Sequence, residues 1–419
     1  MSSSHPYIHT FNQIIKWFLL CLIIGVLIGS ATACFLISLD FVTKFREQNN
    51  WIIFGLPFVG LLLGYLYSLT AEINKGNNLI IEAHHKNENQ KVIPFLMAPL
   101  VYIATILTHL VGGSAGREGT AVQMGGAIAD QFTSWFNLSN EQRKTILILG
   151  ISAGFAAVFG TPWAGAIFAL ELMSFKKISY PSIVPSFLVA FIAHYTCLQW
   201  NVQHTHYNYS VNAISVFDVK NMGWTLLAGI LFGLTALAFS YSNTFWQILF
   251  NRINKPLLIS FLGGLLLLIL YKSTSRNSFM GLGIPEIVNA FEKPAGQYDF
   301  LIKLLLTSFT LSVGFKGGEV TPLFFIGATL GSMLVLYIPL PLSILAAMGF
   351  VAVFAGATHC VIASMVMGFE LFGTQAGLFV SVASISAYFS SGTKGIYSAQ
   401  IKSGIKYTLY NYFSKMKEL

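Results

Sequence analysis

Charged residues are scarce in this sequence. Only 10% of its 419 residues are charged and 55% are hydrophobic, whereas soluble globular domains carry about 25% charged residues. That deficit excludes a water-soluble fold, because too few polar side chains are available to cover its surface. Cysteine is also rare, and its spacings indicate neither a disulfide framework nor a zinc site: Cys21, Cys34, Cys197 and Cys360.

Long apolar runs account for the missing polar residues. Several approach or exceed the length that crosses the hydrocarbon core of a bilayer: Trp17 to Phe41, Trp51 to Leu69, Trp224 to Tyr241 and Pro256 to Tyr271. They are continuous and rich in Leu, Ile, Ala and Gly, unlike the alternating strands of a membrane barrel. We therefore expect an all-α, polytopic membrane protein. We also expect the first run to be retained, because it is as long as a full transmembrane helix.

The net charge of +8 comes from lysines and arginines that gather in short connections and near the C-terminus. By the positive-inside tendency these segments face the cytoplasm. They include Lys44, Arg46, Lys86, Lys91, Arg143, Lys144, Lys176, Lys177, Lys402, Lys406, Lys415 and Lys417. In a membrane protein this charge does not indicate binding to nucleic acid.

Three segments recur in the same order in the two halves of the chain. Residues 154–172 resemble 353–371, GREGT at 116–120 resembles GGEVT at 317–321, and GNNLI at 76–80 resembles GLGIP at 281–285. Such pairs are typical of transporters built from inverted repeats, whose broken helices bind ions near mid-membrane. We predict one membrane domain over residues 1–419, with repeats at approximately 12–200 and 222–400. Helices at 120–129 and 322–336 are expected to stop part-way across the bilayer.

Six carboxylates stand in or beside apolar sequence: Asp40, Glu118, Asp130, Glu171, Glu319 and Glu370. An ionisable group at membrane depth costs about 2.5 to 3.5 kcal/mol on insertion scales, so each is a functional candidate. Glu171 and Glu370 occupy equivalent positions in the two halves, and we favour a structural role for both. Asp130 is expected to be solvated at a helix end.

Glu118 stands in the sequence GGSAGREGTAVQMGG, directly before an expected helix. Glycines allow backbone N–H groups to converge, and a helix N-terminus adds partial positive charge, so this loop can hold an anion. A charged glutamate would occupy that place itself, and a protonated one would leave it. The alternative is a structural ion pair with Arg117, although neighbouring residues on an extended loop point apart.

The GREG loop, the GFAAVFGTP segment and the GGEVTP segment together resemble the CLC family of anion channels and antiporters, over about Phe18 to Tyr397. The resemblance implies the CLC chloride channel fold and an anion site formed by three loops and a tyrosine. Glu118 matches the family's gate. The matching anion-site residues are Gly76, Asn77, Asn78, Leu79, Ile80, Gly116, Arg117, Gly119, Thr120, Val320, Thr321 and Tyr397. From sequence alone, Tyr397 is also compatible with an interfacial belt tyrosine.

Departures from the chloride-type pattern indicate the fluoride/proton antiporter branch. Where chloride-type members have GSGIP this chain has GNNLI, and Val320 replaces the phenylalanine of the third loop. Leu172 stands where proton-coupled chloride exchangers carry an inner glutamate. Glu319 is then the nearest second carboxylate for protons, and Thr321 is a hydroxyl donor for Glu118. The alternative for Glu319 is a buried carboxyl held by local hydrogen bonds, without a role in transport.

The expected function is proton-coupled fluoride export that confers resistance to fluoride, by a secondary active transporter and not an enzyme. The resemblance implies a homodimer in the cytoplasmic membrane, without a cofactor, and the short segment after Tyr397 leaves no room for a cytosolic regulatory domain. Transport of chloride or nitrate, by a channel or an antiporter, is the main alternative. A membrane-embedded enzyme is a remote one, because no HExxH motif is present.

The histidines give weak signals. His204 and His206 share a polar loop, but no cysteine or carboxylate is near them in the sequence, so a metal site is not expected. His109 and His359 lie in or beside apolar runs. We interpret both as core histidines with satisfied hydrogen bonds rather than as proton carriers.

Overall fold

A computed structural model describes residues 6–85, 92–174, 180–205, 207, 214–253, 255–274 and 277–417. Within those ranges the chain is helical and forms no strand, only an isolated bridge between Gly116 and Gly318. The all-α prediction is confirmed. The helices are α1 (Pro6–Gln48), α2 (Leu56–Ser68), α3 (Asn77–His85), α4 (Met97–Leu110), α5 (Glu118–Trp135), α6 (Asn140–Phe159), α7 (Pro162–Ser174), α8 (Tyr180–Gln199), α9 (Val219–Ile253), α10 (Pro256–Thr274), α11 (Ile284–Asn289), α12 (Asp299–Ser312), α13 (Val320–Leu334), α14 (Leu342–Thr358), α15 (Val361–Ser390) and α16 (Ile405–Lys417), with 3-10 turns at Asn50–Gly55, Ile73–Lys75 and Asn277–Phe279.

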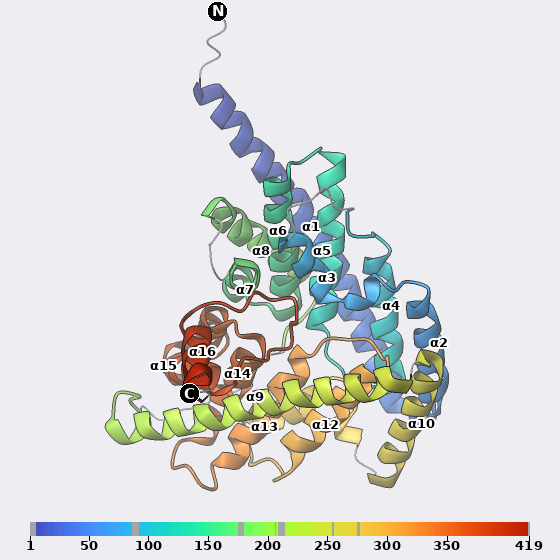
Figure 1. Cartoon of the computed structure of the whole chain (residues 1–419), viewed down its shortest axis with the longest axis vertical. Coiled ribbons are helices and arrows are strands. Elements are labelled where there is room, and N and C mark those ends of the chain that lie inside the picture. The colour runs from blue at the N-terminus through green and yellow to red at the C-terminus, as the bar shows by residue number, and fades with distance from the viewer. Residues whose placement is uncertain are drawn as a thin grey trace, which may run out of the picture.

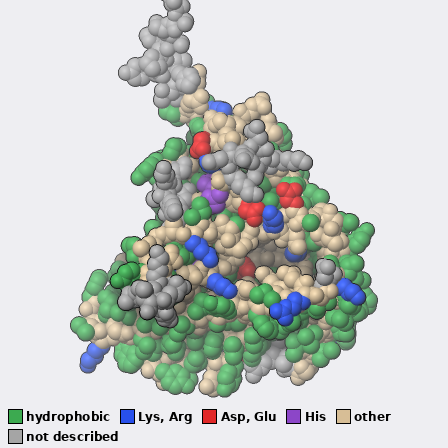
Figure 2. Space-filling model, in the orientation of Figure 1, with side chains coloured by type: hydrophobic (Ala, Val, Ile, Leu, Met, Phe, Trp, Pro, Cys, Tyr) green, Lys and Arg blue, Asp and Glu red, His purple; other side chains and the backbone are tan. Residues whose placement is uncertain are grey.

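Seven helical segments in the described residues are long and apolar enough to cross a membrane: Asn12–Gln48, Asn50–Ser68, Asn140–Phe159, Tyr180–Gln199, Val219–Ile253, Pro256–Ser273 and Val361–Ser390. Their outward side chains are largely apolar, as for Phe58, Leu234 and Ile269, which are more than a third exposed. Figure 2 shows hydrophobic side chains around the edge of the molecule and charged ones over the middle of the visible face. The protein is therefore an integral, multi-pass membrane protein.

Several helices are too short to cross the bilayer. The 14 residues of α4 and the 15 of α13 rise by about 21 and 23 Å, less than the hydrocarbon core of about 30 Å. The long helix α15 is broken at Gly373, whose φ of 69° interrupts the helical backbone. Short and broken helices were predicted, and they place helix ends inside the protein, where backbone N–H groups are free to bind an ion.

Two pairs of closely packed helices surround these interior ends. Helix α5 packs on α6, and α13 packs on α14, which in turn packs on α15. Glycines permit the close approach: a Cβ at Gly125 of α5 would meet the backbone of Gly150, and one at Gly327 of α13 would meet that of Gly349. Around this centre α1 packs on α8 and α2 on α10, while α9 crosses the molecule (Figure 1).

Local sequence fixes where the central helices end. Ser139 and Gln142 form a capping box at the start of α6, where the Gln142 N–H donates to Ser139 Oγ over 3.4 Å and the Ser139 N–H donates to Gln142 Oε1 over 3.0 Å. Helix α6 stops at Gly160, in the left-handed conformation with φ 78°. Helix α14 stops in the same way at His359, with φ 58°.

Candidate functional site

Glu118 is the first residue of α5, and its side chain is 1% exposed. Its carboxylate lies at the start of α13: the Thr321 N–H donates to Oε2 over 2.9 Å. The Thr321 hydroxyl lies 2.5 and 2.6 Å from Oε1 and Oε2. The carboxylate thus occupies a place that suits a free anion, because a helix N-terminus offers N–H groups and partial positive charge there.

Reciprocal backbone bonds join the two loops that precede α5 and α13. The Gly116 N–H donates to Gly318 O over 2.6 Å, and the Gly318 N–H donates to Gly116 O over 2.7 Å. A Cβ at Gly116 would lie 2.9 Å from Gly318 O and 3.1 Å from Glu118 Oε2. The close approach of the two helix starts therefore needs glycine at this position.

Arg117 lies closer to Glu118 than expected. Its Nε is 3.5 Å from Glu118 Oε1, and its backbone N–H donates to Oε2 over 3.2 Å. The prediction that the two side chains point apart is wrong, because Arg117 ends the loop as the N-cap of α5 and is no longer extended. Thr321 nevertheless makes the shorter contacts to the carboxylate, so the ion pair with Arg117 is not the main restraint on Glu118.

The first loop reaches the same region through its two asparagines. Gly76 has a φ of 57°, and α3 begins at Asn77, whose Nδ2 would lie 3.3 Å from a Cβ placed on Gly119. Asn78 Oδ1 accepts the Ala399 N–H over 3.0 Å. Leu79 and Ile80 are buried, so their side chains contribute packing and only their backbone is available to an ion.

Tyr397 lies inside the protein. It is 7% exposed, and the bond from Ile396 N–H to Ala357 O, 2.9 Å long, fixes the segment just before it. This burial does not fit an interfacial belt tyrosine, which would expose its ring and hydroxyl.

Glu319 is the N-cap residue of α13 and is half-buried. Asn243 on α9 donates from Nδ2 to Glu319 Oε1 over 2.9 Å. Asn243 was not predicted as a site residue, although an asparagine within a long apolar helix is a recognisable signal for a buried polar contact. The second carboxylate therefore has one neutral donor.

A small cavity of about 20 Å³ adjoins the gate and is lined by Arg117, Glu118, Thr321, Tyr207 and the rings of Phe159, Phe324 and Phe350. Its volume suits one water-sized particle. The Phe324 and Phe350 rings stack with their centroids 4.0 Å apart. The ring centroid of Tyr207, which was also not predicted as a site residue, is 5.0 Å from that of Phe350. Stacked aromatic rings leave little room for a large hydrated ion beside Glu118.

Glu171 and Glu370 cap each other's helices. The Ile362 and Ala363 N–H groups at the start of α15 donate to the Glu171 carboxylate over 3.1 and 2.9 Å. The Trp163 and Ala164 N–H groups at the start of α7 donate to Glu370 over 3.1 and 2.9 Å. Each carboxylate thus satisfies exposed helix donors inside the membrane, which agrees with the structural role favoured from sequence.

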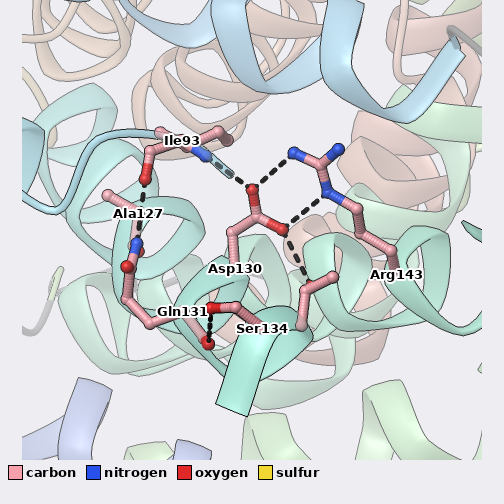
Figure 3. A network of polar contacts seen from close by, with 7 residues as sticks. Ile93, Ala127, Asp130, Gln131, Ser134 and Arg143 are labelled. Atoms are coloured by element: carbon pink, nitrogen blue, oxygen red, sulfur yellow. Dashed lines mark hydrogen bonds and ion pairs between the residues drawn. The ribbon is translucent and has the colours of Figure 1, made fainter. Parts of the chain in front are cut away.

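Asp130 is fully buried, so the expectation of a solvated helix end is wrong. Arg143 of α6 donates to both of its oxygens, from Nε over 2.8 Å and from a terminal nitrogen over 2.7 Å. The Ile93 N–H and the Thr133 hydroxyl donate as well, over 2.8 and 3.0 Å (Figure 3). This pair fastens the end of α5 to α6, and the arginine 13 positions further along compensates the buried charge.

Three histidines that the sequence singled out have polar contacts at their ring nitrogens: His109, His204 and His359. His109 has Nδ1 2.8 Å from Thr105 O and Nε2 3.1 Å from Ala115 O, and His359 contacts Tyr407 and Lys406 over 2.7 and 3.1 Å. His204 Nε2 is 2.9 Å from Ala157 O, and His206 lies outside the described residues. Both His109 and His359 are satisfied, as predicted.

Residues 112–116, Gly-Gly-Ser-Ala-Gly, have the GxSxG spacing of serine hydrolases. However, Ser114 Oγ is 2.9 Å from Thr307 Oγ1, and the nearby His109 directs its nitrogens at backbone oxygens. Among the described residues, the Ser114 hydroxyl contacts a threonine rather than a base that would activate it. This arrangement gives no support to an enzymatic function.

Comparison with known proteins agrees with this geometry. Residues 59–392 match the family model described as voltage gated chloride channel. The chain is 44% identical over 395 residues to a chloride/fluoride channel protein of Pseudomonas syringae pv. tomato, covering 92% of this chain and 86% of that one. It is 27% identical over 340 residues to the H(+)/Cl(-) exchange transporter ClcA of Cronobacter sakazakii, covering 75% and 71%.

Solved structures give the same result. The crystal structure of a CLC-type fluoride/proton antiporter aligns with a TM-score of 0.89 and 35% identity over 94% of this chain and 99% of that one. A slow cyanobacterial Cl-/H+ antiporter aligns over 96% and 98% with a TM-score of 0.77 and 19% identity, which shows the fold alone. Together with the family match and the gate geometry, these similarities show that the chain belongs to the CLC family of voltage-gated chloride channels.

Proposed function

We propose that this protein exports fluoride in exchange for protons. The main support is the contact between the Glu118 carboxylate and Thr321, which offers its N–H and its hydroxyl within 2.9 Å. A group held in this way mimics a bound halide. The names of two relatives, a chloride/fluoride channel protein and a fluoride/proton antiporter, support the choice of ion.

In the proposed cycle Glu118 alternates between two positions. As a carboxylate it fills the anion place at the start of α13, and after proton uptake it leaves because a neutral acid is held less strongly by N–H donors. Fluoride then takes the place, held by the backbone of the three loops and the Thr321 hydroxyl. The small cavity beside Glu118 gives the neutral side chain or a single small ion somewhere to go.

Glu319 is proposed as the second proton carrier. It stands one residue before α13 and two before Thr321, so a proton has only a short distance to cover between the two carboxyls. Asn243 Nδ2 holds one Glu319 oxygen and leaves the other free to receive the proton. Leu172, which is 2% exposed, cannot take this role.

We further propose that the protein works as a homodimer in the cytoplasmic membrane, that each subunit carries its own ion path, and that inward proton flow expels fluoride and so confers resistance to it. Within this proposal residues 1–419 form one membrane domain of two inverted repeats. The reciprocal bonds of Gly116 with Gly318 support this symmetry, as does the mutual capping of Glu171 and Glu370.

The function is tested in proteoliposomes loaded with sodium fluoride, with a fluoride electrode and a pH probe recording at the same time. We expect fluoride efflux to drive proton uptake into the vesicles at a fixed ratio. Robust chloride or nitrate flux with negligible fluoride flux would remove the proposal in favour of another anion on the same fold. Fluoride flux without proton movement would indicate a channel.

Thr321→Val tests the hydroxyl that holds the gate. Valine keeps the backbone N–H and the size of the side chain but removes the donor, and a hydrogen bond to a charged group contributes about 1.5 to 3 kcal/mol. We expect fluoride turnover to fall by about tenfold or more, the equivalent of about 1.4 kcal/mol, while Thr321→Ser stays near the unmodified rate. The readout is the initial rate of fluoride efflux.

The matched control is Thr329→Val on the same helix. The Thr329 hydroxyl is buried like that of Thr321 but donates to the helix's own carbonyls, at Phe325 over 2.7 Å and at Ile326 over 3.3 Å. If Thr321→Val and Thr329→Val transport fluoride at the same rate, the contact with Glu118 has no part in the cycle.

Glu319→Gln tests the second carboxyl. Glutamine keeps the oxygen that accepts from Asn243, so the local structure should persist, but it cannot exchange a proton at membrane pH. We expect fluoride binding to remain and coupled proton flux to fall. Isothermal titration with fluoride and proton flux in vesicles separate the two effects. Unchanged proton flux would show that Glu319 is only a buried, hydrogen-bonded carboxyl.

A further inference from the structure

Helices α4 and α12 lead into the two loops that precede α5 and α13, which we call the gate loops. Both helices carry buried threonines at matching positions. Thr105 and Thr307 each stand five residues before the last residue of their helix, and Thr108 and Thr310 each stand two before it. All four are fully buried. A hydroxyl in such surroundings costs free energy unless it is hydrogen-bonded, so the partners of these residues are informative.

Two of the threonines are bonded crosswise. Ser114, in the loop after α4, places its Oγ 2.9 Å from Thr307 Oγ1 on α12. Lys316, in the loop after α12, donates its backbone N–H to Thr108 Oγ1 on α4 over 3.2 Å. Each gate loop is therefore held by the helix that leads into the other loop. These contacts lie two residues before Gly116 and Gly318, which bond to each other.

His109 adds a bond that the second half lacks, since Leu311 stands at the matching position of α12. Its Nε2 lies 3.1 Å from the carbonyl oxygen of Ala115, the residue just before Gly116. One turn earlier on α4, Thr105 Oγ1 lies 2.7 Å from Thr120 Oγ1 at the start of α5. His109 and Thr105 thus tie the loop that carries Glu118, and the start of α5 that follows it, to α4.

We propose that Thr108, Thr307 and His109 are positioning residues that set the separation between the starts of α5 and α13, and through it the preference for a small anion. They do not touch the ion and act through the backbone of the two loops. This inference rests on the proposed function, because it takes fluoride as the ion held between those helix starts.

The physical reason is the short range of the contacts that a small anion needs. The attraction between an anion and a donor falls with their separation, and fluoride, being smaller than chloride, loses a larger fraction of it when the donors move apart by the same distance. A looser pair of loops should therefore weaken fluoride transport and admit chloride more readily, even though Glu118 and Thr321 are unchanged.

The experiment compares Thr108→Val and Thr307→Val with the control Thr310→Val. The Thr310 hydroxyl is buried at the same helical level but donates over 2.6 Å to Leu306 O of its own helix. The initial rates of fluoride and chloride efflux from vesicles give the fluoride-to-chloride flux ratio. Because a hydrogen bond contributes about 1 kcal/mol, we expect Thr108→Val and Thr307→Val each to lower this ratio about fivefold. Thr310→Val should keep it, and Thr108→Ser should restore it.

A flux ratio for Thr108→Val and Thr307→Val that equals that of Thr310→Val overturns the proposal. If a valine variant does not fold, Ser114→Ala removes the contact to Thr307 from the side of the loop and must lower the same ratio. His109→Leu, which introduces the residue type found at Leu311, should lower the ratio as Thr108→Val and Thr307→Val do. His109→Gln keeps a donor and should lower it by a smaller factor. Failure of the unmodified chain to exchange fluoride for protons would refute the proposed function instead.

Discussion

Glu118→Gln abolishes coupled proton movement in the mechanism proposed here. Glutamine has almost the same shape, and its oxygen still accepts from the Thr321 N–H, but it can neither carry the charge that competes with fluoride nor exchange a proton. We expect proton flux coupled to fluoride to fall about 100-fold or more, as is common when a positioned acid–base group is removed. Anion movement either stops or continues without protons.

The measurement is the paired recording of fluoride and pH in vesicles. Glu292→Gln is the matched control, because it removes one carboxylate from an exposed connection outside the site and should leave both fluxes unchanged. Coupled exchange at the original ratio in Glu118→Gln would contradict the gate assignment. Fluoride flux that persists without proton movement would show that this carboxyl couples the two fluxes. It would also show that fluoride can bind without this carboxyl.

The fold class and the gate loops could be predicted because they depend on local sequence. Long apolar runs and scarce charge require membrane helices, and a glutamate among glycines ahead of a helix indicates an anion place. The contact between Thr321 and Glu118 was also suggested in advance, by the resemblance of the GGEVT segment to the fluoride/proton antiporter branch.

Other site residues could not be found from sequence because their roles depend on packing between distant segments. Asn243 lies 76 positions before Glu319 and becomes its donor only because α9 crosses the second gate loop. Tyr207 stands in a polar stretch, yet it joins the aromatic rings of the cavity beside Glu118. The crossed bonds of Ser114 with Thr307 and of Lys316 with Thr108 require the two halves to be in contact.

The burial of Asp130 could not be predicted from sequence for the same reason. Its position ten residues after Thr120 indicated a helix end, whereas α5 continues past Asp130 to Trp135. The prediction of solvation failed because exposure depends on what packs against the helix end. Here α6 returns directly alongside α5 and brings Arg143 to both carboxylate oxygens. An aspartate and an arginine separated by a turn therefore deserve to be considered as a buried pair in membrane sequences.

Asp130→Asn is expected to destabilise the protein strongly without entering the transport cycle. The substitution leaves the Arg143 guanidinium buried, with 8% of its side chain exposed, and facing a neutral amide in place of a carboxylate. Removing one partner of a buried ion pair costs about 3 to 5 kcal/mol, because the remaining charge is uncompensated. The measurement is the melting temperature in detergent, followed by the fraction of protein that stays monodisperse on size exclusion.

The control is Asp40→Asn, which breaks a pair with Lys44 whose N···O distance of 2.6 Å is similar to that of the buried pair. There the side chains are 62% and 67% exposed, and an exposed pair contributes little, so the melting temperature should hardly move. A similar melting temperature for the two variants would show that water or other acceptors already compensate Arg143. If Asp130→Asn melts early but the folded fraction keeps its proton-to-fluoride ratio, the Asp130–Arg143 pair holds α5 against α6 and leaves coupling to the residues at the other end of α5.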